Sequence, residues 1–370
     1  MSRLEAYKED LYELRFSPMC KPAGEVANLT MLESHTTRGR VMMLWRIASG
    51  IATWHEREIE LVYQSTLDSI SEAFDVFHYP LSQIMLAARA DIWDAGLAPK
   101  CVRRAVETGS TTTTDVPRDD TLLLAGEVAQ LGTDSLLSPM QDALRQAELD
   151  ASVWVTSTPA LAYVLGARDV ATAQAQEIVN GIETSGAKTV IADGPETAWA
   201  LTKILPDLGS EVPEQVTIKL LSVALAERQP GSHNGQTKLL GPVFVHDSRP
   251  ACLIADEMAG SLAILPGYVE DEAQFGSGAV YDAPRQLLDA LGAQRVFGTW
   301  TRSLAKTSGA DDGLWLTYPE LAAGLAQQRL ENAAVLGATT LVTDSPLAAA
   351  FLAQHETGVQ VKLLAELLLS

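Results

Sequence analysis

An internal repeat constrains the fold of this chain more than any other feature of its sequence. The segment GAKTVIADGPETAWAL, which starts at Gly186, matches GATTLVTDSPLAAAFL, which starts at Gly337, at an offset of 151 residues. Thr156 falls against Thr307 at the same offset. A repeat of this kind indicates repeated structural units, so the sequence predicts two related lobes.

Short β-rich runs alternate with alanine-rich helical segments over the second two thirds of the chain. Strands that alternate with helices form parallel, doubly wound sheets, so we expect two α/β (Rossmann-like) lobes. The expected strands lie at 121–126, 153–156 and 189–193 in the first lobe and at 242–247, 295–300 and 340–344 in the second.

The first part of the chain has a helical pattern instead. Apolar residues recur at helical spacing from Arg38 to about Gly50, and a further helix is expected from Trp54 to Ile70. A Thr-rich segment with Gly and Pro but no periodicity follows and is typical of a linker. The sequence thus predicts an α+β multidomain chain. Its parts are an all-helical domain at 1–107, a linker at 108–120, a first lobe at 121–236 and a second lobe at 237–370.

The charge of the chain limits its partners. It has 27 Lys and Arg against 47 Asp and Glu, which gives a net charge of -20. A field of this sign repels phosphate backbones and anionic lipids, so we expect no nucleic acid partner. The charged N-terminus has no apolar signal core, and no apolar run reaches the roughly 18 residues of a membrane span. We therefore expect a cytoplasmic protein, associated with a membrane only through its partners.

Four polar residues have the spacing of an iron-sulfur ligand set. Ser65, Asp68, Ser71 and Asp75 follow the interval that bacterial-type ferredoxins use for the cysteines of a four-iron cluster. With the following LAARADIWDAGLAP, they resemble the second cluster motif in the iron-sulfur subunits of glycolate oxidase, anaerobic glycerol-3-phosphate dehydrogenase and heterodisulfide reductase. Every ligand cysteine of that motif is replaced. With Glu72, these oxygens could instead hold a hard cation, but capping residues have the same composition, and we expect no metal.

An earlier segment is similar to the first cluster motif of the same family. Counting back from its tail, the ligand positions fall on Leu14, Ser17, Cys20 and Gly24, so one thiol remains of four. A single thiolate cannot hold a four-iron cluster. The residues that match the tail are Glu33, Ser34, Thr37, Arg38, Gly39 and Arg40.

The duplicated lobes resemble the paired cysteine-rich (CCG) domains of the heterodisulfide reductase catalytic subunits. Each domain of that family carries a Cys-Cys-Gly and a later Cys-Pro-x-Cys. In the first lobe these motifs fall on Thr156, Ser157 and Thr158 and on Gly194, Pro195, Glu196 and Thr197. In the second lobe they fall on Thr307, Ser308 and Gly309 and on Ser345, Pro346, Leu347 and Ala348. The prolines remain and the cysteines do not.

A further motif follows the first strand of the second lobe. His246, Asp247 and Ser248 resemble the His-Asp-Pro-Cys turn of the family without its thiol, and Cys252 could be that cysteine displaced. The segment 281–288 matches its Pro-Arg-x-Leu-Leu. We call the positions at which the family has cluster cysteines the vestigial positions. They are Ser17, Cys20, Gly24, Ser65, Asp68, Ser71, Asp75, Thr156, Ser157, Gly194, Thr197, Ser248, Cys252, Thr307, Ser308, Ser345 and Ala348.

The resemblance implies a degenerate iron-sulfur protein with a helical ferredoxin-like domain and two CCG lobes. Because nearly every ligand is lost, we expect no cofactor in this chain and a non-catalytic scaffold role in an oxidoreductase (electron-transfer) complex. The implied partners are an iron-sulfur paralogue with a 4Fe-4S cluster or an FAD-linked oxidase. Two alternatives stay open. One is an electron-transfer protein with a single cluster completed by Cys20, Cys252 or partner thiolates; the other is an enzyme that reuses the crevice between the lobes, with His246 as base beside Asp247.

Overall fold

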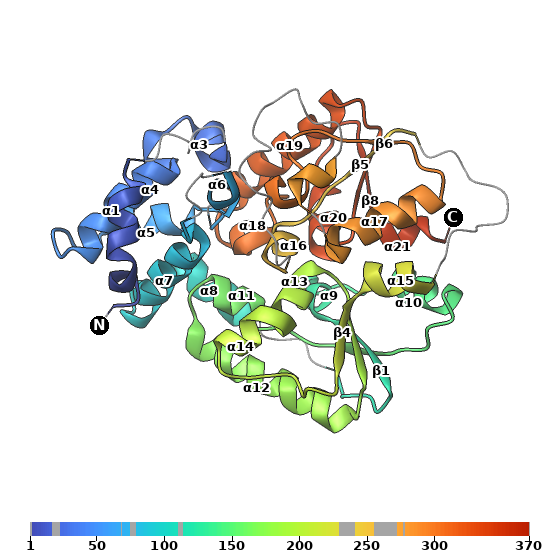
Figure 1. Ribbon diagram of the computed structural model, residues 1–370. Helices are drawn as coiled ribbons and strands as arrows, with labels where there is room; N and C mark the ends of the chain where they lie inside the picture. Colours follow the sequence, from blue (N-terminus) through green and yellow to red (C-terminus); the bar gives the residue numbers. More distant parts are fainter. Residues whose placement is uncertain are drawn as a thin grey trace.

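Two four-stranded parallel sheets organise the protein (Figure 1). In this computed structural model the first sheet has the order β2-β1-β3-β4 and the second has the order β6-β5-β7-β8, so both follow the same scheme. The fold is therefore α/β in its two lobes, preceded by a helical region. The structure describes residues 2–16, 23–67, 69–74, 79–109, 114–228, 241–254, 272–276 and 278–369.

The first sheet is apolar at its centre. Leu123 of β1 lies between Val153 of β2 and Ile191 of β3 in parallel register. Parallel strands with helices on both faces are buried on both sides, which explains the continuous apolar run in β1. The elements of this lobe are β1 (Thr121–Ala125), α9 (Gly126–Leu131), α10 (Leu137–Gln146), β2 (Ser152–Val155), α11 (Ala160–Val164), α12 (Arg168–Ser185), β3 (Thr189–Ala192), α13 (Pro195–Trp199), the π-helical η3 (Ala200–Ile204), α14 (Leu205–Asp207), β4 (Thr217–Leu220) and α15 (Leu221–Arg228).

The second sheet is built in the same way around β5. Val243 of β5 pairs with Arg295 of β6 on one side and with Thr340 of β7 on the other. The elements of this lobe are β5 (Val243–Val245), α16 (Arg249–Ile254), η5 (Glu272–Phe275), α17 (Ala279–Ala290), β6 (Arg295–Val296), η6 (Arg302–Leu304), η7 (Asp311–Gly313), α18 (Leu314–Thr317), α19 (Pro319–Val335), β7 (Thr340–Thr343), α20 (Pro346–Leu352), β8 (Gln360–Leu363) and α21 (Leu364–Leu367).

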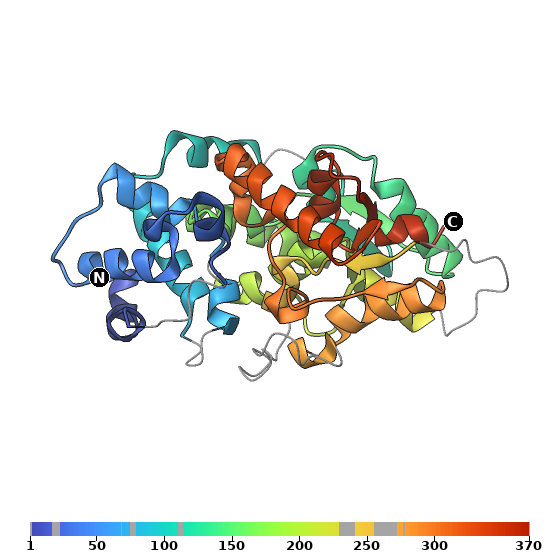
Figure 2. The ribbon, with the colours of Figure 1, turned by 90° about the horizontal axis from the view of Figure 1, so that it is seen from above.

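The described part of the chain before residue 110 is helical. It packs beside both lobes, as Figures 1 and 2 show from two directions. Arg89 ties it to the first lobe by donating a hydrogen bond to the carbonyl of Val164 at 2.7 Å. Gly166 permits this approach, because a Cβ there would lie 2.4 Å from the carbonyl oxygen of Arg89. The elements are η1 (Leu4–Tyr7), α1 (Lys8–Leu14), α3 (Glu25–Thr30), η2 (Glu33–His35), α4 (Thr37–Ala48), α5 (Glu56–Tyr63), α6 (Ser69–Phe74), α7 (Leu81–Asp94) and α8 (Lys100–Thr108).

The prediction of a single helix over 54–70 is wrong, because the structure has two helices there, α5 and α6. Ser65 donates its hydroxyl to the carbonyl of Val62 at 2.8 Å, and Leu67 has a left-handed backbone with a φ of 53°. Arg89 also donates to the carbonyl of Ser65 at 2.9 Å. Side-chain hydrogen bonds of this kind compete with the helical ladder and end the helix.

One of the hydrophobic clusters of the described residues spans both lobes. Helix α15 of the first lobe packs on α17 of the second, and α9 packs on α20. Leu123 and Val155 of the first sheet belong to the same buried cluster as Val243, Leu288 and Val342 of the second lobe. The carboxyl ends of strands from both sheets therefore meet at one junction.

None of the helices that the structure describes is both long and apolar enough to cross a membrane.

Candidate functional site

Acidic side chains follow the strands of both sheets where the lobes meet. Asp193 and Asp344 come directly after β3 and β7, and Glu127 and Asp247 come two residues after β1 and β5. All four are buried. Open α/β sheets bind ligands at the carboxyl ends of their strands, which makes this junction the candidate site.

Glu127 connects the two lobes through both of its carboxylate oxygens. Oε1 accepts a hydrogen bond from the backbone N–H of Glu196, in the first turn of α13, at 2.8 Å. Oε2 accepts from the backbone N–H of Leu347, in the first turn of α20, at 3.0 Å and from the Ser345 hydroxyl at 2.6 Å. First-turn N–H groups have no partner inside their helix, and they attract a carboxylate. One side chain thus caps a helix in each lobe.

The space around Glu127 is closely filled. A Cβ at Gly194 would lie 2.2 Å from Oε1 of Glu127. A Cβ at Gly126 would lie 2.4 Å from Cγ2 of Thr158 and 2.5 Å from Oγ1 of Thr197. The vestigial positions Gly194 and Thr197 therefore lie against Glu127 and its neighbour.

Asp193 holds the start of α9 in place. Its Oδ1 accepts a hydrogen bond from the Thr197 hydroxyl at 2.6 Å, and its Oδ2 accepts from the backbone N–H of Val128 at 3.0 Å. Thr197 in turn accepts from the backbone N–H of Glu127 at 3.2 Å. The vestigial Thr197 is thus part of the structure that positions Glu127.

Burial raises the pKa of three acids of the first lobe at this junction. It raises the pKa of Glu127 well above the ordinary range, and the nearby carboxyl groups of Asp193 and Glu196 add to the effect. Burial raises the pKa of Asp193 to about 6. Burial, followed by Asp311 and Asp312, raises the pKa of Glu196 to about 8. At neutral pH the junction therefore retains protons that exposed acids would have lost.

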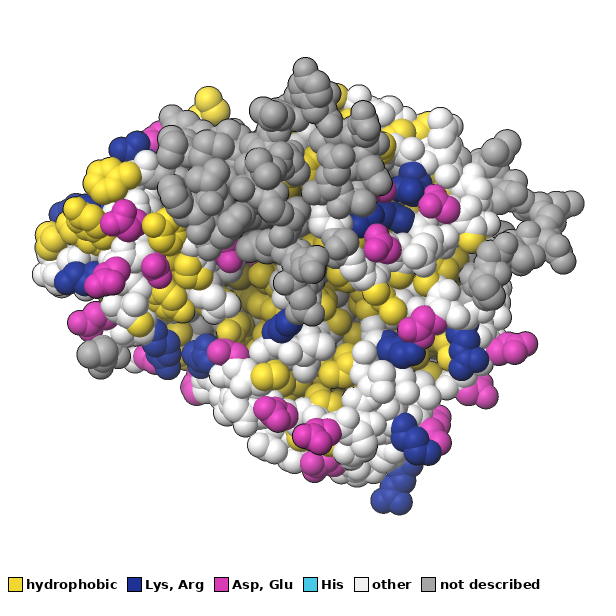
Figure 3. Space-filling view, in the orientation of Figure 1, with side chains coloured by type: hydrophobic (Ala, Val, Ile, Leu, Met, Phe, Trp, Pro, Cys, Tyr) yellow, Lys and Arg dark blue, Asp and Glu magenta, His cyan; other side chains and the backbone are white. Residues whose placement is uncertain are grey.

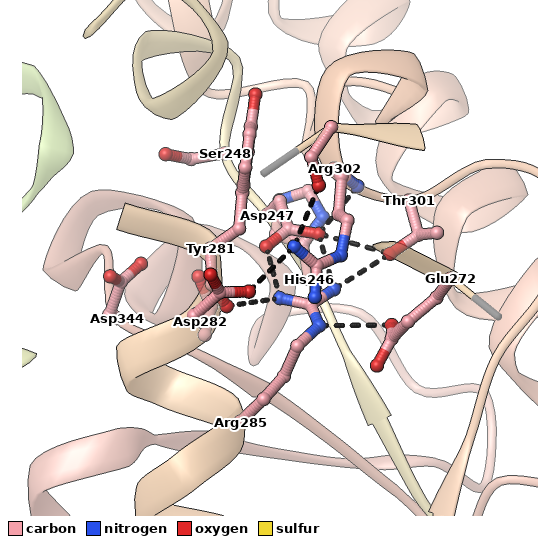
Figure 4. Close-up of polar contacts among 12 residues, drawn as sticks. His246, Asp247, Ser248, Glu272, Tyr281, Asp282, Arg285, Thr301, Arg302 and Asp344 are labelled. Atoms are coloured by element: carbon pink, nitrogen blue, oxygen red, sulfur yellow. Dashed lines mark hydrogen bonds and ion pairs between the residues drawn. The ribbon is translucent and has the colours of Figure 1, made fainter. Parts of the chain in front are cut away.

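Asp247 anchors a buried network in the second lobe (Figure 4). Arg285 donates two hydrogen bonds to it, one to each oxygen, both at 2.8 Å. Thr301 donates its hydroxyl to Oδ2 at 3.1 Å, and the backbone N–H of Arg302 donates to the same oxygen at 2.7 Å. Burial alone would raise the pKa of Asp247, but Arg285 outweighs it and lowers that pKa to about 2. With its acceptors occupied, Asp247 has a structural role.

His246 lies beside this network but has a partner of its own. Arg329 donates from Nε to Nδ1 of His246 at 2.9 Å, so the ring proton lies on Nε2. Nε2 is buried and has no hydrogen-bond partner among the described residues. Burial and then Arg329 lower the pKa of His246 well below its usual value. The ring is therefore a neutral hydrogen-bond donor. This geometry does not favour the general base of the enzyme alternative, and Asp247 does not orient the ring.

Cys252 on α16 lies at the edge of the same region. Its thiol donates to the carbonyl of Arg302 at 3.1 Å, and Nη1 of Arg249 lies 3.7 Å from the sulfur. The side chain is half-buried, and burial raises its pKa. Ser248, four residues earlier, has a buried hydroxyl that no described residue contacts by a hydrogen bond. Ser248 and Cys252 are the two candidate positions for the thiol of the His-Asp-Pro-Cys turn, and they lie within about one helical turn of each other.

The vestigial turn of the second lobe is held by carboxylates. The hydroxyls of Thr307 and Ser308 donate to Oδ2 of Asp311 at 2.8 and 3.2 Å. The backbone N–H of Thr307 donates to Oε1 of Glu25 in α3 at 2.7 Å. This turn therefore also fixes the helical region to the second lobe.

The remaining vestigial positions take ordinary structural roles or lie elsewhere. Ser345 caps α20 by accepting from the backbone N–H of Ala348 at 3.1 Å. Ser71 accepts a hydrogen bond from Thr37 at 2.8 Å. Thr156 and the hydroxyl of Ser157 are buried, and Gly24 precedes α3. The positions that lie outside the described residues are Ser17, Cys20, Asp68 and Asp75.

A small hollow opens between the lobes next to this junction. It is lined mainly by leucines of α15, β8 and α21, together with Ser222 and Asp344. The Ser222 hydroxyl donates to Oδ2 of Asp344 at 3.1 Å. Burial, followed by Asp247, raises the pKa of Asp344 to about 7. Hydrophobic side chains also show towards the middle of the face in Figure 3, between the two lobes.

Within the described ranges, no three His, Cys, Asp or Glu side chains gather in a group that could hold a metal ion.

Sequence reasoning does not single out Glu127. The signal that could have found it is its place directly after the apolar run TLLLAG, where a buried parallel strand ends. A carboxylate at that place is expected near the carboxyl edge of a sheet.

No family model and no curated protein matches this chain. Among solved structures, the chain is similar to a hypothetical protein from Helicobacter pylori, with a TM-score of 0.57 and 11% sequence identity. The match covers 98% of this chain and 71% of that one. At this identity the likeness shows the fold alone.

Proposed function

We propose that this chain is a cluster-free relative of the iron-sulfur and CCG-domain proteins and acts as a structural subunit of a cytoplasmic oxidoreductase complex. In this proposal the N-terminal helices are a degenerate ferredoxin-like domain and the two lobes are degenerate CCG domains. The 4Fe-4S cluster or the FAD lies in a partner, either an iron-sulfur paralogue or an FAD-linked oxidase.

One observation carries the proposal: at three of the vestigial positions, Thr197, Ser345 and Thr307, the hydroxyl is engaged in a hydrogen bond to a buried carboxylate. Thr197 donates to Asp193, and Ser345 donates to Glu127. Thr307 donates to Asp311. Iron-sulfur clusters need several converging thiolates, and hydroxyls bonded in this way neither replace them nor leave their space open. At these three positions the hydroxyl is part of the packed interior.

Charged side chains extend from equivalent places in the two lobes. Thr189 and Thr340 are matched positions of the repeat, and they pair with Thr121 of β1 and Val243 of β5, so these two strand residues are equivalent. Glu127 lies six residues after Thr121, and Arg249 lies six residues after Val243. Glu127 is held by backbone N–H groups, and Arg249 donates to the carbonyl of Ala305 at 2.8 Å. Both side chains are therefore held by groups of the protein itself, which supports a fold that is stable without a cofactor.

The electron-transfer alternative depends on thiols. Cys252 donates to a backbone carbonyl, and Cys101 lies in α8 near Tyr63 and Tyr318. Cys20 lies outside the described residues. A cluster on this chain would therefore need thiolates from a partner.

The enzyme alternative depends on His246. Its buried Nε2–H has no acceptor within the described part of the chain, so a ligand in this place would have to offer one. This favours binding through His246 over proton abstraction by it.

The decisive measurement is iron and acid-labile sulfide per chain, with an absorption spectrum, on the complex purified anaerobically from its native host. We expect almost no iron in this chain and a stoichiometric partner that holds iron or flavin. About four irons per chain, with a broad band near 400 nm, would contradict the proposal. Purification of the chain alone, without a partner, would contradict it as well.

Two matched variants assign any iron that is found. Cys252→Ser would remove it if Cys252 is a ligand, whereas Cys101→Ser controls for the loss of a half-buried thiol elsewhere. If both variants keep the same amount of iron, the ligands are Cys20 or thiolates of the partner.

A further inference from the structure

The repeat provides an internal comparison for Arg329. Helices α12 and α19 precede the matched turns at Gly186 and Gly337, and their buried faces coincide at the offset of 151 residues. Arg329 therefore corresponds to Ile178, and each of these two side chains is 1% exposed. The same core position thus holds an aliphatic side chain in the first lobe and a guanidinium in the second.

His246 has an apolar counterpart as well. The pairing of β1 with β3 and of β5 with β7 makes His246 equivalent to Leu124. Leu124 and Ile178 belong to one hydrophobic cluster of the first lobe, whereas His246 and Arg329 are joined by a hydrogen bond of 2.9 Å. Apolar side chains of similar volume are often at least as stable in such a place as a buried ion. The fold itself therefore does not require the polar pair of the second lobe.

Arg329 is a buried cation to which the described residues offer no ion pair. Its Nη1 donates to the carbonyl of Trp300 at 2.9 Å, and its guanidinium lies 4.7 Å from the centre of the Phe244 ring. Its Nη2 has no hydrogen-bond partner in the described part of the chain. Burial lowers the pKa of Arg329 to about 10, so the side chain is still protonated at neutral pH. A buried charge without a paired group of opposite sign is costly.

The acidic groups around Arg329 are engaged elsewhere. Asp247, Glu25 and Asp311 act on its charge from a distance. Asp247 pairs with an arginine of α17 at 2.8 Å, and Glu25 and Asp311 accept hydrogen bonds at the turn of residues 307–308. The charge of Arg329 therefore lacks a partner that the other buried arginine network has.

His246 adds a second donor without a partner (Figure 4). Because Arg329 donates to Nδ1, the ring proton lies on Nε2, which is buried and has no partner among the described residues. Burial lowers the pKa of His246, and the charges of Arg329 and Arg249 lower it further, so the ring stays neutral. Lys306 also lies close enough to Arg329 for their charges to repel. The place thus combines positive charge with N–H donors, which is the chemistry that binds oxyanions.

We propose that the second lobe binds a small oxyanion, a phosphate or a carboxylate, through Nη2 of Arg329 and Nε2 of His246 at the carboxyl end of β5. Because one hydrogen bond of 2.9 Å joins the two side chains, these nitrogens lie within roughly 7 Å of each other, which two hydrogen bonds to one oxyanion can span. Open α/β sheets bind ligands at this edge. The burial of both side chains limits the ligand to a small ion. This inference goes beyond the structural role proposed above and does not depend on it.

Thermal unfolding of the full chain in inorganic phosphate or in acetate tests the site. NaCl keeps the ionic strength constant, because screening alone affects so acidic a chain. We expect one of the two anions to raise the melting temperature saturably, by about 2 °C when its concentration is roughly tenfold above its dissociation constant. A response to phosphate alone assigns a phosphate ligand, and a response to acetate alone assigns a carboxylate. If neither anion raises the melting temperature above the chloride baseline, the proposal is overturned.

A double variant built from the repeat removes the site. His246→Leu with Arg329→Ile places the side chains of the first lobe at the matched positions of the second. This variant should melt in chloride at or above the wild-type temperature and should lose the response to the anion. Arg145→Met is the control, because it removes an exposed guanidinium of the first lobe, and it should keep the response. A response that persists in the double variant, or disappears in the control, would overturn the proposal.

Nuclear magnetic resonance of the wild-type chain keeps the test independent of the variants. The chain has six histidines, and labelling them with ¹⁵N reports each ring N–H. His246 is recognised by a ring that stays neutral where exposed histidines titrate. We expect its Nε2–H signal to shift with the anion and to saturate at the same concentration as the melting temperature. If the melting temperature rises while this signal stays fixed, the anion binds elsewhere and the proposal fails.

Discussion

Arg285 and Asp247 form a two-point ion pair inside the second lobe, with both nitrogen-to-oxygen distances at 2.8 Å. Arg285 is on α17 and Asp247 follows β5, so the pair joins a helix to the end of the central strand. Their side chains are 4% and 3% exposed. The same carboxylate fixes the loop at Thr301 and Arg302.

The first prediction concerns this pair. Arg285→Met should lower the free energy of unfolding by about 3 to 5 kcal/mol, because it leaves the Asp247 charge buried and unpaired. Urea unfolding at neutral pH measures the change. The matched control is Arg295→Met, since Arg295 is partly exposed and also pairs with carboxylates. Arg295→Met should lower the free energy of unfolding far less than Arg285→Met does. Equal losses in the two variants would contradict the assignment.

Asp312 gives a prediction about pH. Burial raises its pKa to about 7, with Asp311 adding to the rise and Arg89 opposing it. A raised carboxyl pKa means that the folded state binds the proton more tightly, so this residue lowers stability as pH rises from about 4 to about 7. Asp312→Asn should therefore raise the free energy of unfolding at pH 8 by roughly 1 to 4 kcal/mol.

Asparagine suits this position because Asp312 has a left-handed backbone with a φ of 61°, which asparagine tolerates. Urea unfolding at pH 4.5, 6 and 8 should show a gain that grows with pH. A gain that is the same at all three pH values would argue against titration of Asp312.

Gly126 gives a packing prediction. A Cβ at this position would lie 2.4 Å from Thr158 and 2.5 Å from Thr197, and neither side chain is a long flexible one. Gly126→Ala should destabilise the protein by about 1 to 3 kcal/mol through overpacking. Gly298→Ala is the control, because the nearest atoms there belong to Leu336 at 3.1 Å. Thermal unfolding of both variants would decide, and a neutral Gly126→Ala would be inconsistent with the close packing.

The net charge predicts a response to salt. With a net charge of -20, the folded chain repels itself. Raising NaCl from about 0.1 to 1 M shortens the Debye length from about 10 Å to about 3 Å and should raise the melting temperature. A neutral osmolyte at the same osmolality gives the baseline. A melting temperature that falls with salt would show that exposed ion pairs dominate over the repulsion.

The sequence pattern predicts β1, β2, β3, β5 and β7, because each is an apolar run followed by a helical segment. The strand expected over 295–300 is only the two-residue β6, Arg295–Val296. The pattern misses β4 and β8, which lie at matching edges of the two sheets. Their sequences, TIKL and QVKL, are short and carry a lysine each, and both begin with an exposed residue. An edge strand has a solvated side and lacks the continuous apolar run that marks a central parallel strand.

The candidate site is less predictable than the fold. The pattern does place Asp247 and Ser345 at strand ends, but it does not reveal that Glu127 reaches Ser345, which is 218 residues away in the sequence. It also suggests that His246 and Asp247 act together, whereas they take different arginines as partners. Such pairings depend on how the lobes pack on each other, and local spacing carries no information about that.

Substitutions in one half of the repeat affect the other half, because both halves bind the same side chain. The backbone N–H groups of Glu196 and Leu347 occupy matched positions of the repeat, and both donate to the single carboxylate of Glu127. A substitution that shifts either helix by a fraction of an ångström alters the hydrogen bonds of the other. Natural variants should therefore show epistasis between the two matched turns, with changes near 194–197 tolerated only alongside changes near 345–348.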